Sequence, residues 1–553
     1  MLFRSTLACR GITNQIEIDS FFNPSLGQLH SPCLLPDLDA AVTRLCQALD
    51  NKESILVFGD YDVDGLTATA MLVRALKAMG GQVTGTIPER LEEGYGLNLP
   101  TLESAAEAGF KVVLTVDCGV SALAEAQAAR ALGLDLIITD HHEPGPELPE
   151  AIAVVDPKRA DSQYPFEQLA GVGVAFKLLC ALAEARGLSC EEVHKGFLDL
   201  VALGTVADVV PLLDENRILA HFGLQALQHT SKAGLRALLK AADLEGKAIS
   251  SWDVAFLLAP RLNSAGRIAR AETALQLLLT GKPDRAQELA NSLCELNETR
   301  KLKQNEILRE VWSQADVEVN VEDRRILILS GLGWNPGIIG IVASQLVQQY
   351  RRPAILISID EETGLARGSA RSTPDFNLFE ALQDCQELLE QFGGHSRAAG
   401  LTVKVENLEA LKTRLVSLAW ERLLPEHTEA WLNVDAELSA DEFNCCFRQE
   451  LGQLAPFGEA NEEPVWVTRG MEVLDCYTVG RDNAHLKLVL SLGEGCIGAI
   501  GFGLGQAGPR IQYGTKLDIA YTIGENGKGG RCEIEVRLRD LALAAKAEGG
   551  QPG

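Results

Sequence analysis

Residues 54–70, S-I-L-V-F-G-D-Y-D-V-D-G-L-T-A-T-A, form the stretch that decides the fold of this chain. Residues 55–58 are a short apolar run of the kind found in a buried strand, and a glycine ends it. Asp60, Asp62 and Asp64 follow at alternate positions before a predicted helix. Three carboxylates at the end of a strand repel one another unless a cation lies among them, and hard divalent cations prefer oxygen ligands. An acidic turn that caps the helix is the alternative interpretation.

Length and composition limit the possible classes of protein. The 553 residues are too many for one hydrophobic core, so we expect three or four domains. The 46% hydrophobic and 23% charged residues are typical of a soluble globular protein, and no apolar run is long enough to span a bilayer. The N-terminal residues lack the sustained apolar stretch of a signal peptide, so we do not expect one there. We therefore expect no membrane association.

The cysteines and the net charge indicate the environment and constrain the partners. The 13 cysteines are scattered and include no C-x-x-C pair, which favours buried thiols in a reducing cytoplasm over a zinc finger or a disulfide framework. The formal charge of −26 is unusual for a protein that binds nucleic acid. Any such binding must depend on local arginine clusters and metal ions.

Beyond residue 80, strand and helix patterns alternate. Apolar strands are predicted over 83–87, 111–116, 134–139 and 151–155, with an alanine-rich helix over 121–132. This alternation predicts a parallel sheet covered on both faces, with its site at the carboxyl ends of the strands. The residues that follow two of these strands are polar: Asp117, and Asp140-His141-His142.

Two further segments belong to the same predicted domain. G-T-V-A-D carries Asp208 after an apolar helical run, and R-L-N-S-A-G-R carries Arg261 and Arg267. Residues 283–314 lack glycine and keep helical apolar spacing, which predicts a long helix joining two domains. Two shorter helices of one domain remain the alternative.

The second half of the chain begins a new α/β unit. A glycine-rich turn, G-W-N-P-G-I-I-G, leads from a strand into a helix and offers backbone N–H groups to an anion. R-G-S-A-R places Ser369 and Arg371 on one strand face, and F-G-G-H-S-R-A-A-G carries Gly394 and His395 in a second glycine-rich turn. From residue 432 short alternating runs predict a small β-barrel.

Carboxylates and one imidazole from separate segments suit Mn²⁺ or Mg²⁺, and their number favours two ions. The residues concerned are Asp62, Asp64, Asp117, His141 and Asp208, with Asp60 and His142 beside them. Each has a simpler structural interpretation. Asp117 and Asp140 could cap helices, and an isolated histidine is more often hydrogen-bonded than metal-bound.

The motifs G-D-Y-D-V-D-G, V-D-C-G, T-D-H-H and G-T-V-A-D resemble, in chain order, those of the DHH phosphoesterase superfamily. The later G-W-N-P-G-I-I-G-I-V-A-S, R-G-S-A-R and F-G-G-H-S-R-A-A-G resemble its associated second domain. With R-L-N-S-A-G-R and a C-terminal β-module, the resemblance extends over nearly the whole chain. It points to one branch, the bacterial RecJ single-strand-specific exonucleases.

The resemblance implies a 5′-to-3′ exonuclease that acts on single-stranded DNA in repair and recombination, depends on two Mn²⁺ or Mg²⁺ ions and releases 5′-mononucleotides. It implies a cytoplasmic protein, with single-strand-binding protein and a helicase as candidate partners. Its implied metal ligands are Asp60, Asp62, Asp64, Asp117, His141 and Asp208. His142 would orient substrate or stabilise the transition state. The implied substrate-binding residues are Arg90, Arg261, Arg267, Ser369, Arg371, Gly394 and His395.

The sequence departs from the pattern at two positions. Phe58 stands where many members have a histidine, which leaves His141 as the main nitrogen ligand. Asn335 stands where a histidine usually follows the tryptophan, so a substrate contact there is in doubt.

The resemblance and the patterns together predict an α/β protein. The expected parts are a helical lead-in (1–50), a parallel-sheet DHH catalytic domain (51–280), a connecting helix (281–320), a DHH-associated α/β domain (321–425), an OB-like barrel (428–545) and a disordered tail (546–553).

Two other functions remain open. A small-substrate phosphoesterase of the same superfamily, acting on pyrophosphate, oligonucleotides or cyclic dinucleotides, would agree with the acidic charge. A catalytically silent DNA-binding relative would not need the intact Asp/His set.

Overall fold

The computed structural model describes residues 2–90, 94–320, 324–424, 431–439, 442, 450–493, 495–526 and 533–544. Its described part divides into two compact units. The larger comprises His30–Val210 and Phe222–Trp431, and the smaller comprises Met1–Leu29, Pro211–His221 and Leu432–Gly553. The expected tail, 546–553, lies outside the described residues.

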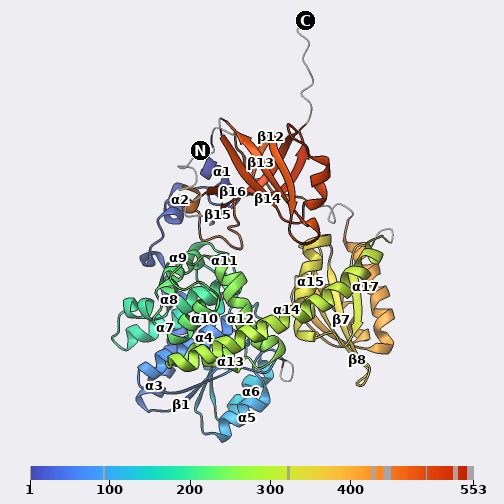
Figure 1. Cartoon of the computed structure of the whole chain (residues 1–553). Coiled ribbons are helices and arrows are strands. Elements are labelled where there is room, and N and C mark those ends of the chain that lie inside the picture. The colour runs from blue at the N-terminus through green and yellow to red at the C-terminus, as the bar shows by residue number, and fades with distance from the viewer. Residues whose placement is uncertain are drawn as a thin grey trace. The chain divides into compact units, whose positions relative to one another are not determined.

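The first sheet of the larger unit is entirely parallel, in the order β2-β1-β3-β4-β5. Its strands are β1 (Ser54–Gly59), β2 (Gln82–Thr86), β3 (Val112–Val116), β4 (Asp135–Thr139) and β5 (Ala153–Val155). Helices α5 (Leu99–Glu107) and α6 (Leu123–Ala131) pack on one face, and α4 (Val63–Ala78) and α7 (Gly171–Ala185) contact strands of the sheet. The predicted parallel sheet is thus confirmed (Figure 1).

Phe58 is fully buried in the hydrophobic cluster that β1, β3 and β4 form with α5 and α6. Its neighbours there include Leu56, Cys118 and Val120. The ring therefore has a packing role, and burial of apolar surface explains why a phenylalanine is stable at this position.

Further helices belong wholly or partly to this unit. They are α3 (Leu38–Asp50), α8 (Cys190–Ala207), α9 (Asp214–Gln228), α10 (Ala233–Ala241), α12 (Ala259–Ile268) and α13 (Glu272–Leu279). The segment predicted as one long connecting helix is a single helix, α14 (Pro283–Asn320), of 38 residues. It contacts α10, α12 and α13 with its first part and the second α/β domain with its last part (Figure 1).

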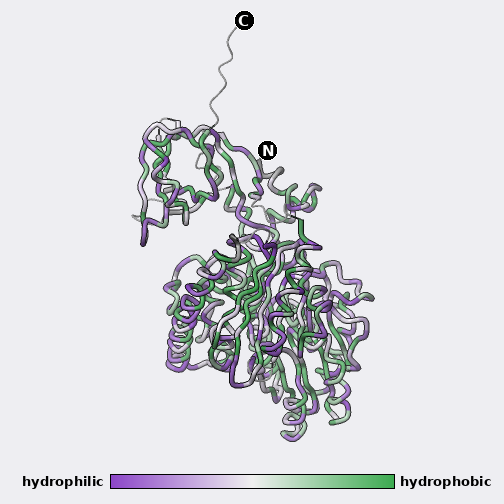
Figure 2. Tube along the Cα trace, turned by 90° about the vertical axis from the view of Figure 1, so that its right-hand side faces the viewer, coloured by the Kyte–Doolittle hydropathy of each residue, from purple (hydrophilic) through white to green (hydrophobic). Residues whose placement is uncertain are grey.

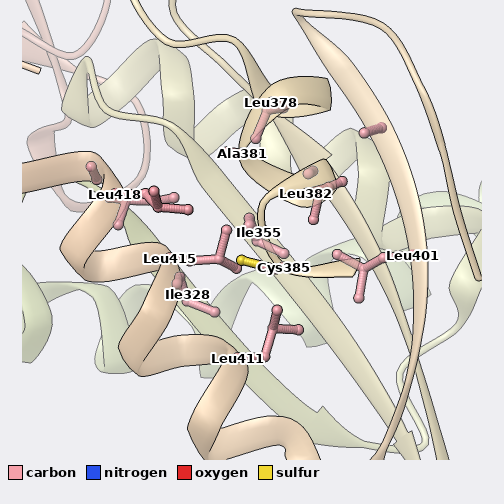
Figure 3. Close-up of a cluster of buried hydrophobic side chains, with 14 of the residues drawn as sticks. Ile328, Ile355, Leu378, Ala381, Leu382, Cys385, Leu401, Leu411, Leu415 and Leu418 are labelled. Atoms are coloured by element: carbon pink, nitrogen blue, oxygen red, sulfur yellow. The ribbon is translucent and has the colours of Figure 1, made fainter. Parts of the chain in front are cut away.

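The second sheet has the order β6-β7-β8-β10-β9, parallel between β6 and β7 and antiparallel elsewhere. Its strands are β6 (Leu327–Leu332), β7 (Ala354–Asp360), β8 (Leu365–Arg371), β9 (Leu389–Gly394) and β10 (Ala398–Lys404). Helix α15 (Pro336–Tyr350) covers one face together with α14. Helices α16 (Leu378–Gln383) and α17 (Leu408–Arg422) cover the other, where Leu382, Leu411 and Leu415 meet Ile328 and Ile355 (Figure 3).

The smaller unit is built on a closed barrel. Its sheet order is β11-β12-β13-β14-β16-β15, and an additional β12–β15 pairing closes it. The strands are β11 (Ala436–Glu437), β12 (Trp466–Val479), β13 (His485–Leu492), β14 (Gly495–Gly501), β15 (Lys516–Asn526) and β16 (Glu533–Leu543). The predicted OB-like barrel is therefore confirmed.

Arg217 joins three sequence segments of this smaller unit. Its buried guanidinium donates to the carbonyl oxygens of Phe21 at 3.2 Å and Leu454 at 2.9 Å, and lies 3.6 Å from the centre of the Phe21 ring. A charge buried in this way is stable only when carbonyl oxygens satisfy it. Helix α2 (Gln15–Phe22) is consequently fixed to the barrel module.

The hydropathy of the trace follows these layers. The strands inside the larger unit are mainly hydrophobic, and hydrophilic segments are spread over the surrounding helices and loops (Figure 2). Among the helices that the structure describes, none has both the length and the apolar character that crossing a bilayer requires.

Candidate metal centre and phosphate-binding cluster

The acidic stretch after β1 is both a helix cap and part of a larger site. α4 begins at Val63, because Asp62 acts as its N-cap. Asp62 Oδ1 accepts hydrogen bonds from the backbone N–H groups of Asp64 at 2.9 Å and Gly65 at 3.1 Å. Asp64 therefore projects from the first turn of the helix. The N-cap interpretation is correct for Asp62 but leaves its second oxygen available.

Asp64 is fixed by a second helix N-terminus. Its carboxylate accepts hydrogen bonds from the N–H groups of Gly171 at 2.6 Å and Val172 at 2.8 Å, both at the start of α7. A Cβ at Gly171 would lie 2.8 Å from Asp117 Oδ1 and 2.9 Å from Asp64 Oδ2. Only glycine permits the helix to approach both carboxylates this closely.

Asp117 ends β3 in a left-handed backbone conformation, with φ of 60°. This conformation is uncommon for residues other than glycine, and aspartate tolerates it better than most. The carboxylate is buried, and Oδ1 lies 3.0 Å from His141 Nε2 without an aligned hydrogen bond. Asp117 and His141 are therefore adjacent at the carboxyl ends of neighbouring strands, as predicted.

His141 presents Nε2 to the acidic residues. Nε2 lies 3.9 Å from Asp64 Oδ2 and 3.7 Å from Asp208 Oδ2. Burial, and then the charge of His142, lower the pKa of His141 to about 3, while a backbone hydrogen bond to Leu169 opposes this shift. The imidazole is consequently neutral at physiological pH, which is the form that ligates metals.

We call Asp60, Asp62, Asp64, Asp117, His141 and Asp208 the carboxylate cluster. Asp208 follows the last residue of α8 and donates its N–H to Gly204 O at 2.9 Å. Among the described residues, three sets each place one ligand atom per residue within 4.8 Å of the others. They are Asp60/Asp62/Asp117, Asp64/His141/Asp208 and Asp117/His141/His142.

Several groups of the cluster have no complement among the residues that the structure describes. Asp60 Oδ1, Asp117 Oδ1 and His141 Nε2 are buried without a hydrogen-bond partner. Burial, and then neighbouring carboxylates, raise the pKa of Asp64 to about 7 and also raise the pKa of Asp60, Asp117 and Asp208. Unpaired buried acceptors of like charge are costly. Divalent cations would satisfy all of these atoms together.

Asp140 serves a different purpose from its neighbours. Oδ1 accepts from the backbone N–H of His141 at 2.8 Å and contacts His142 Nδ1 at 2.8 Å, and Oδ2 accepts from Val120 N at 2.9 Å. Burial raises the pKa of Asp140, but its bonds to the histidines outweigh burial and leave that pKa below its usual value. The pKa of His142 is correspondingly raised, since Asp140 outweighs the effect of burial. Asp140 therefore orients His142 and favours its charged form.

A second group of like charges consists of Arg90, Arg267, Arg300 and Arg371, which we call the arginine cluster. Burial, and then the charges of Arg90, Arg300 and Arg371, lower the pKa of Arg267 to about 9. Arg90 lies 4.8 Å from the centre of the Tyr61 ring, and Arg267 Nη1 donates to Gly337 O at 3.1 Å. Mutual repulsion of this kind is relieved by an anion such as phosphate.

Ser369 and Arg371 contribute to this cluster from β8. Arg371 Nη1 donates to Ser369 Oγ at 3.2 Å. A Cβ at Gly340 in α15 would lie 2.8 Å from Ser369 Oγ and 3.1 Å from Arg371 Nη2. The glycine-rich helix start thus leaves room for the two substrate-binding candidates, and the structure brings Arg90, Arg267 and Arg371 together.

His395 lies close to the carboxylate cluster. Its ring stacks on the ring of His142 with centroids 6.2 Å apart. The preceding Gly394 has φ of 132°, and the His395 N–H donates to Ala398 O at 2.8 Å, which closes the turn between β9 and β10. The second α/β domain therefore brings a histidine beside the DHH motif.

Arg261 makes other contacts. It donates to Leu257 O within its own helical segment and to Cys294 Sγ of α14 at 3.4 Å. Its predicted phosphate contact stays a prediction.

Asn335 acts as the N-cap of α15, where Oδ1 accepts from Gly337 N at 2.9 Å. It also lines a cavity of about 840 Å³ with Lys303, Trp334 and Arg367. Its local role is therefore the same as that of Asp62 in α4.

Sequence patterns missed two contributors. Arg300 lies on α14, whose periodicity does not reveal which polar residues face the site. Gly171 belongs to the sequence G-V-G-V. The two glycines of this sequence, at the start of an apolar helix, are its one signal that the helix approaches neighbouring groups closely.

Comparison with known proteins identifies three domains in the chain. Residues 54–205 match the DHH family, N-terminal domain, residues 323–421 match the DHHA1 domain, and residues 434–540 match the RecJ OB domain. The single-stranded-DNA-specific exonuclease RecJ of Bacillus subtilis is 38% identical over 543 residues, which cover 98% of this chain and 68% of that protein.

The chain belongs to the RecJ family. The crystal structure of RecJ in complex with Mn²⁺ from Thermus thermophilus matches with a TM-score of 0.82 at 32% identity, covering 99% of this chain and 76% of that one. The crystal structure in complex with Mg²⁺ from the same organism matches with a TM-score of 0.77 at 31% identity, covering 98% and 74%. RecJ membership accounts for all three modules of the chain.

Proposed function

We propose that this protein is a metal-dependent exonuclease specific for single-stranded DNA. It digests from the 5′ end, releases 5′-mononucleotides and acts in DNA repair and recombination. The observation that carries the proposal is the buried carboxylate cluster, whose unpaired atoms Asp60 Oδ1, Asp117 Oδ1 and His141 Nε2 lie in a chain that matches RecJ proteins over nearly its full length.

Mn²⁺ or Mg²⁺ would be held by Asp60, Asp62, Asp64, Asp117, His141 and Asp208. The donor set is mostly oxygen with one neutral imidazole, which fits these hard cations. Two of the three ligand sets, Asp60/Asp62/Asp117 and Asp64/His141/Asp208, share no residue, which supports two ions. Such ions, when bound, polarise a phosphoryl oxygen and make a water nucleophilic near neutral pH.

The chain's own residues supply the rest of the chemistry. The arginine cluster, with Ser369, binds strand phosphates, because its repelling charges gain a common counter-ion. Asp140 raises the pKa of His142 beside His141 and so favours the imidazolium, whose charge would oppose negative charge on the reacting phosphate. Gly394 and His395 extend the substrate contacts from the second α/β domain.

The barrel module distinguishes a polymer substrate from a small one. OB folds bind single strands through exposed aromatic side chains and basic groups. Phe502 and Tyr513 are 63% and 77% exposed in this module, so it can offer rings to bases. A phosphoesterase for cyclic dinucleotides or pyrophosphate would not need them.

Partners and location follow from the same activity. An enzyme restricted to single strands requires a helicase to open duplexes, and single-strand-binding protein would cover the product of that helicase. The described cysteines are free thiols, which supports a reducing cytoplasm.

The decisive experiment uses one long single strand labelled at either its 5′ or its 3′ end, with Mn²⁺ or Mg²⁺. We expect the 5′ label to appear at once as mononucleotide, while the 3′-labelled strand shortens progressively. Asp62→Asn should abolish both while strand binding persists. Resistance of the strand with rapid cleavage of a dinucleotide would instead establish the small-substrate function, and inactivity on both would favour a silent DNA-binding relative.

A further inference from the structure

Lys158 lies beside the DHH motif but has no role in the site described above. It follows β5, the strand next to β4, and the N–H of Asp140 donates to Val155 O at 3.1 Å. The N–H of Lys158 donates to Asp156 Oδ1 at 2.8 Å, and Asp156 is fully buried. The turn that carries Lys158 is therefore anchored next to Asp140-His141-His142.

The side chain of Lys158 is mostly enclosed, yet its ionic partner is weak. Nζ lies 3.4 Å from Glu143 Oε1, and the two side chains are 18% and 70% exposed. Pairs that involve such an exposed carboxylate contribute little stability. The next residue differs, since Arg159 pairs with Asp37 and Asp161 and donates to Val154 O. Arg159 thus stabilises the fold, whereas Lys158 can exchange its partner at small cost.

The charge of Lys158 affects groups of the carboxylate cluster and also His395 of the second α/β domain. Burial raises the pKa of Asp208 and lowers the pKa values of His141 and His395. The charge of Lys158 opposes the first of these shifts and adds to the other two. Arg90 has the corresponding effect on the pKa of Asp60, where burial again dominates. The carboxylate cluster therefore has a cation near Asp60 and another near Asp208.

We propose that Lys158 is a substrate-contacting residue whose ammonium exchanges Glu143 for a non-bridging oxygen of the phosphodiester at the carboxylate cluster. This inference rests on the proposed function. No covalent bond changes. A point charge on a long side chain suits a phosphate that must be released after each cleavage. Glu143 holds the ammonium near the site until a strand arrives.

The test compares Lys158→Met and Lys158→Arg with Lys195→Met, a matched control whose exposed ammonium pairs with Glu191 on α8. We expect Lys158→Met to lower kcat/KM on a labelled single strand about 10²-fold. Lys158→Arg should keep most of the activity, and Lys195→Met should behave as wild type. Since one phosphate contact is lost, the slope of log(kcat/KM) against log[salt] should become shallower by about 1 in Lys158→Met.

Two further measurements separate this role from a structural one. The thermal shift that Mn²⁺ produces should be the same in Lys158→Met as in wild type, because Lys158 is not a metal ligand. Glu143→Gln should lower KM, since it removes the carboxylate that competes with phosphate, and this holds even if Lys158→Met fails to fold. Unchanged kcat/KM or salt slope in Lys158→Met, a lost Mn²⁺ shift, or a raised KM in Glu143→Gln would overturn the proposal. If wild type itself does not digest single strands, the proposed function fails instead.

Discussion

The carboxylate cluster and the arginine cluster are two groups of like charges that are held in opposite ways. The carboxylates all follow strand or helix ends of one domain, and backbone N–H groups help to fix them, as those of Gly171 and Val172 at the start of α7 do for Asp64. The arginines come from a loop, α12, α14 and β8, so Arg371 joins the other three only because the second α/β domain packs on α14. Each cluster would bind charges of the opposite sign, and the two differ in how the chain holds their members in place.

The largest expected effect tests the carboxylate side of this comparison. Asp117→Asn keeps the shape but removes a charge that no hydrogen bond compensates. We expect turnover to fall on the order of 10³-fold or more, because a candidate metal ligand is lost. Without metal, the variant should gain stability relative to wild type as pH rises, since it has one buried carboxylate fewer to ionise. Kinetics and thermal unfolding in EDTA measure the two effects, with Glu150→Gln as a surface control. A destabilised, fully active variant would contradict the assignment.

A smaller effect is expected on the arginine side. Arg371→Gln should lower kcat/KM about 10²-fold, because one charge in a preorganised phosphate site is lost. Arg367→Gln is a matched control on the same face of β8, and it should remain within about threefold of wild type because Arg367 is exposed and has no part in the cluster. The Mn²⁺ concentration for half-maximal activity should stay constant in both. Equal losses in the two variants would mean that the arginines act only through general electrostatic attraction.

The pH dependence of stability distinguishes the two clusters without any substrate. Burial, and then Asp62, raise the pKa of Asp64 to about 7. An unfolded aspartate titrates near 3.9, so the folded protein binds more protons between these values. Stability without metal is therefore highest at low pH within this window and falls as pH rises through about 7. Arg267, with a pKa of about 9, stays protonated throughout.

Saturating Mn²⁺ should cancel or reverse that fall, because bound metal requires ionised carboxylates. Thermal unfolding at pH 5, 6, 7 and 8, with EDTA or with Mn²⁺, would show it. Asp117→Asn should flatten the EDTA profile. If the midpoint temperature of unfolding in EDTA instead rises with pH, other groups compensate the charges of these carboxylates in the folded protein.

The same comparison explains what the sequence could predict. Asp117, His141 and Asp208 were recognisable because parallel strands and the helices beside them bring their carboxyl ends to one edge, so local patterns specify a shared location. The roles of Arg300 and Gly171 could not be recognised in the same way, because they depend on how helices pack across the domain. Arg261 shows the converse. It stands in a motif with Arg267, yet packing turns it toward Cys294.

Substitution of Asn335 should have the smallest and most local effect. It tests whether the glycine-rich start of α15 binds the DNA strand or only shapes the arginine cluster. The side chain of Asn335 caps α15 by accepting from Gly337 N, and the carbonyl of Gly337 accepts from Arg267. Asn335→Ala should cost about 1 kcal/mol of stability, and Asn335→Ser should restore most of it, as at other helix N-caps. If capping is the only role, kcat/KM at a temperature well below unfolding should be unchanged in both variants. If Asn335→Ser recovers stability but not kcat/KM, the side chain contacts the strand directly, and the arginine cluster would extend into the cavity beside Trp334.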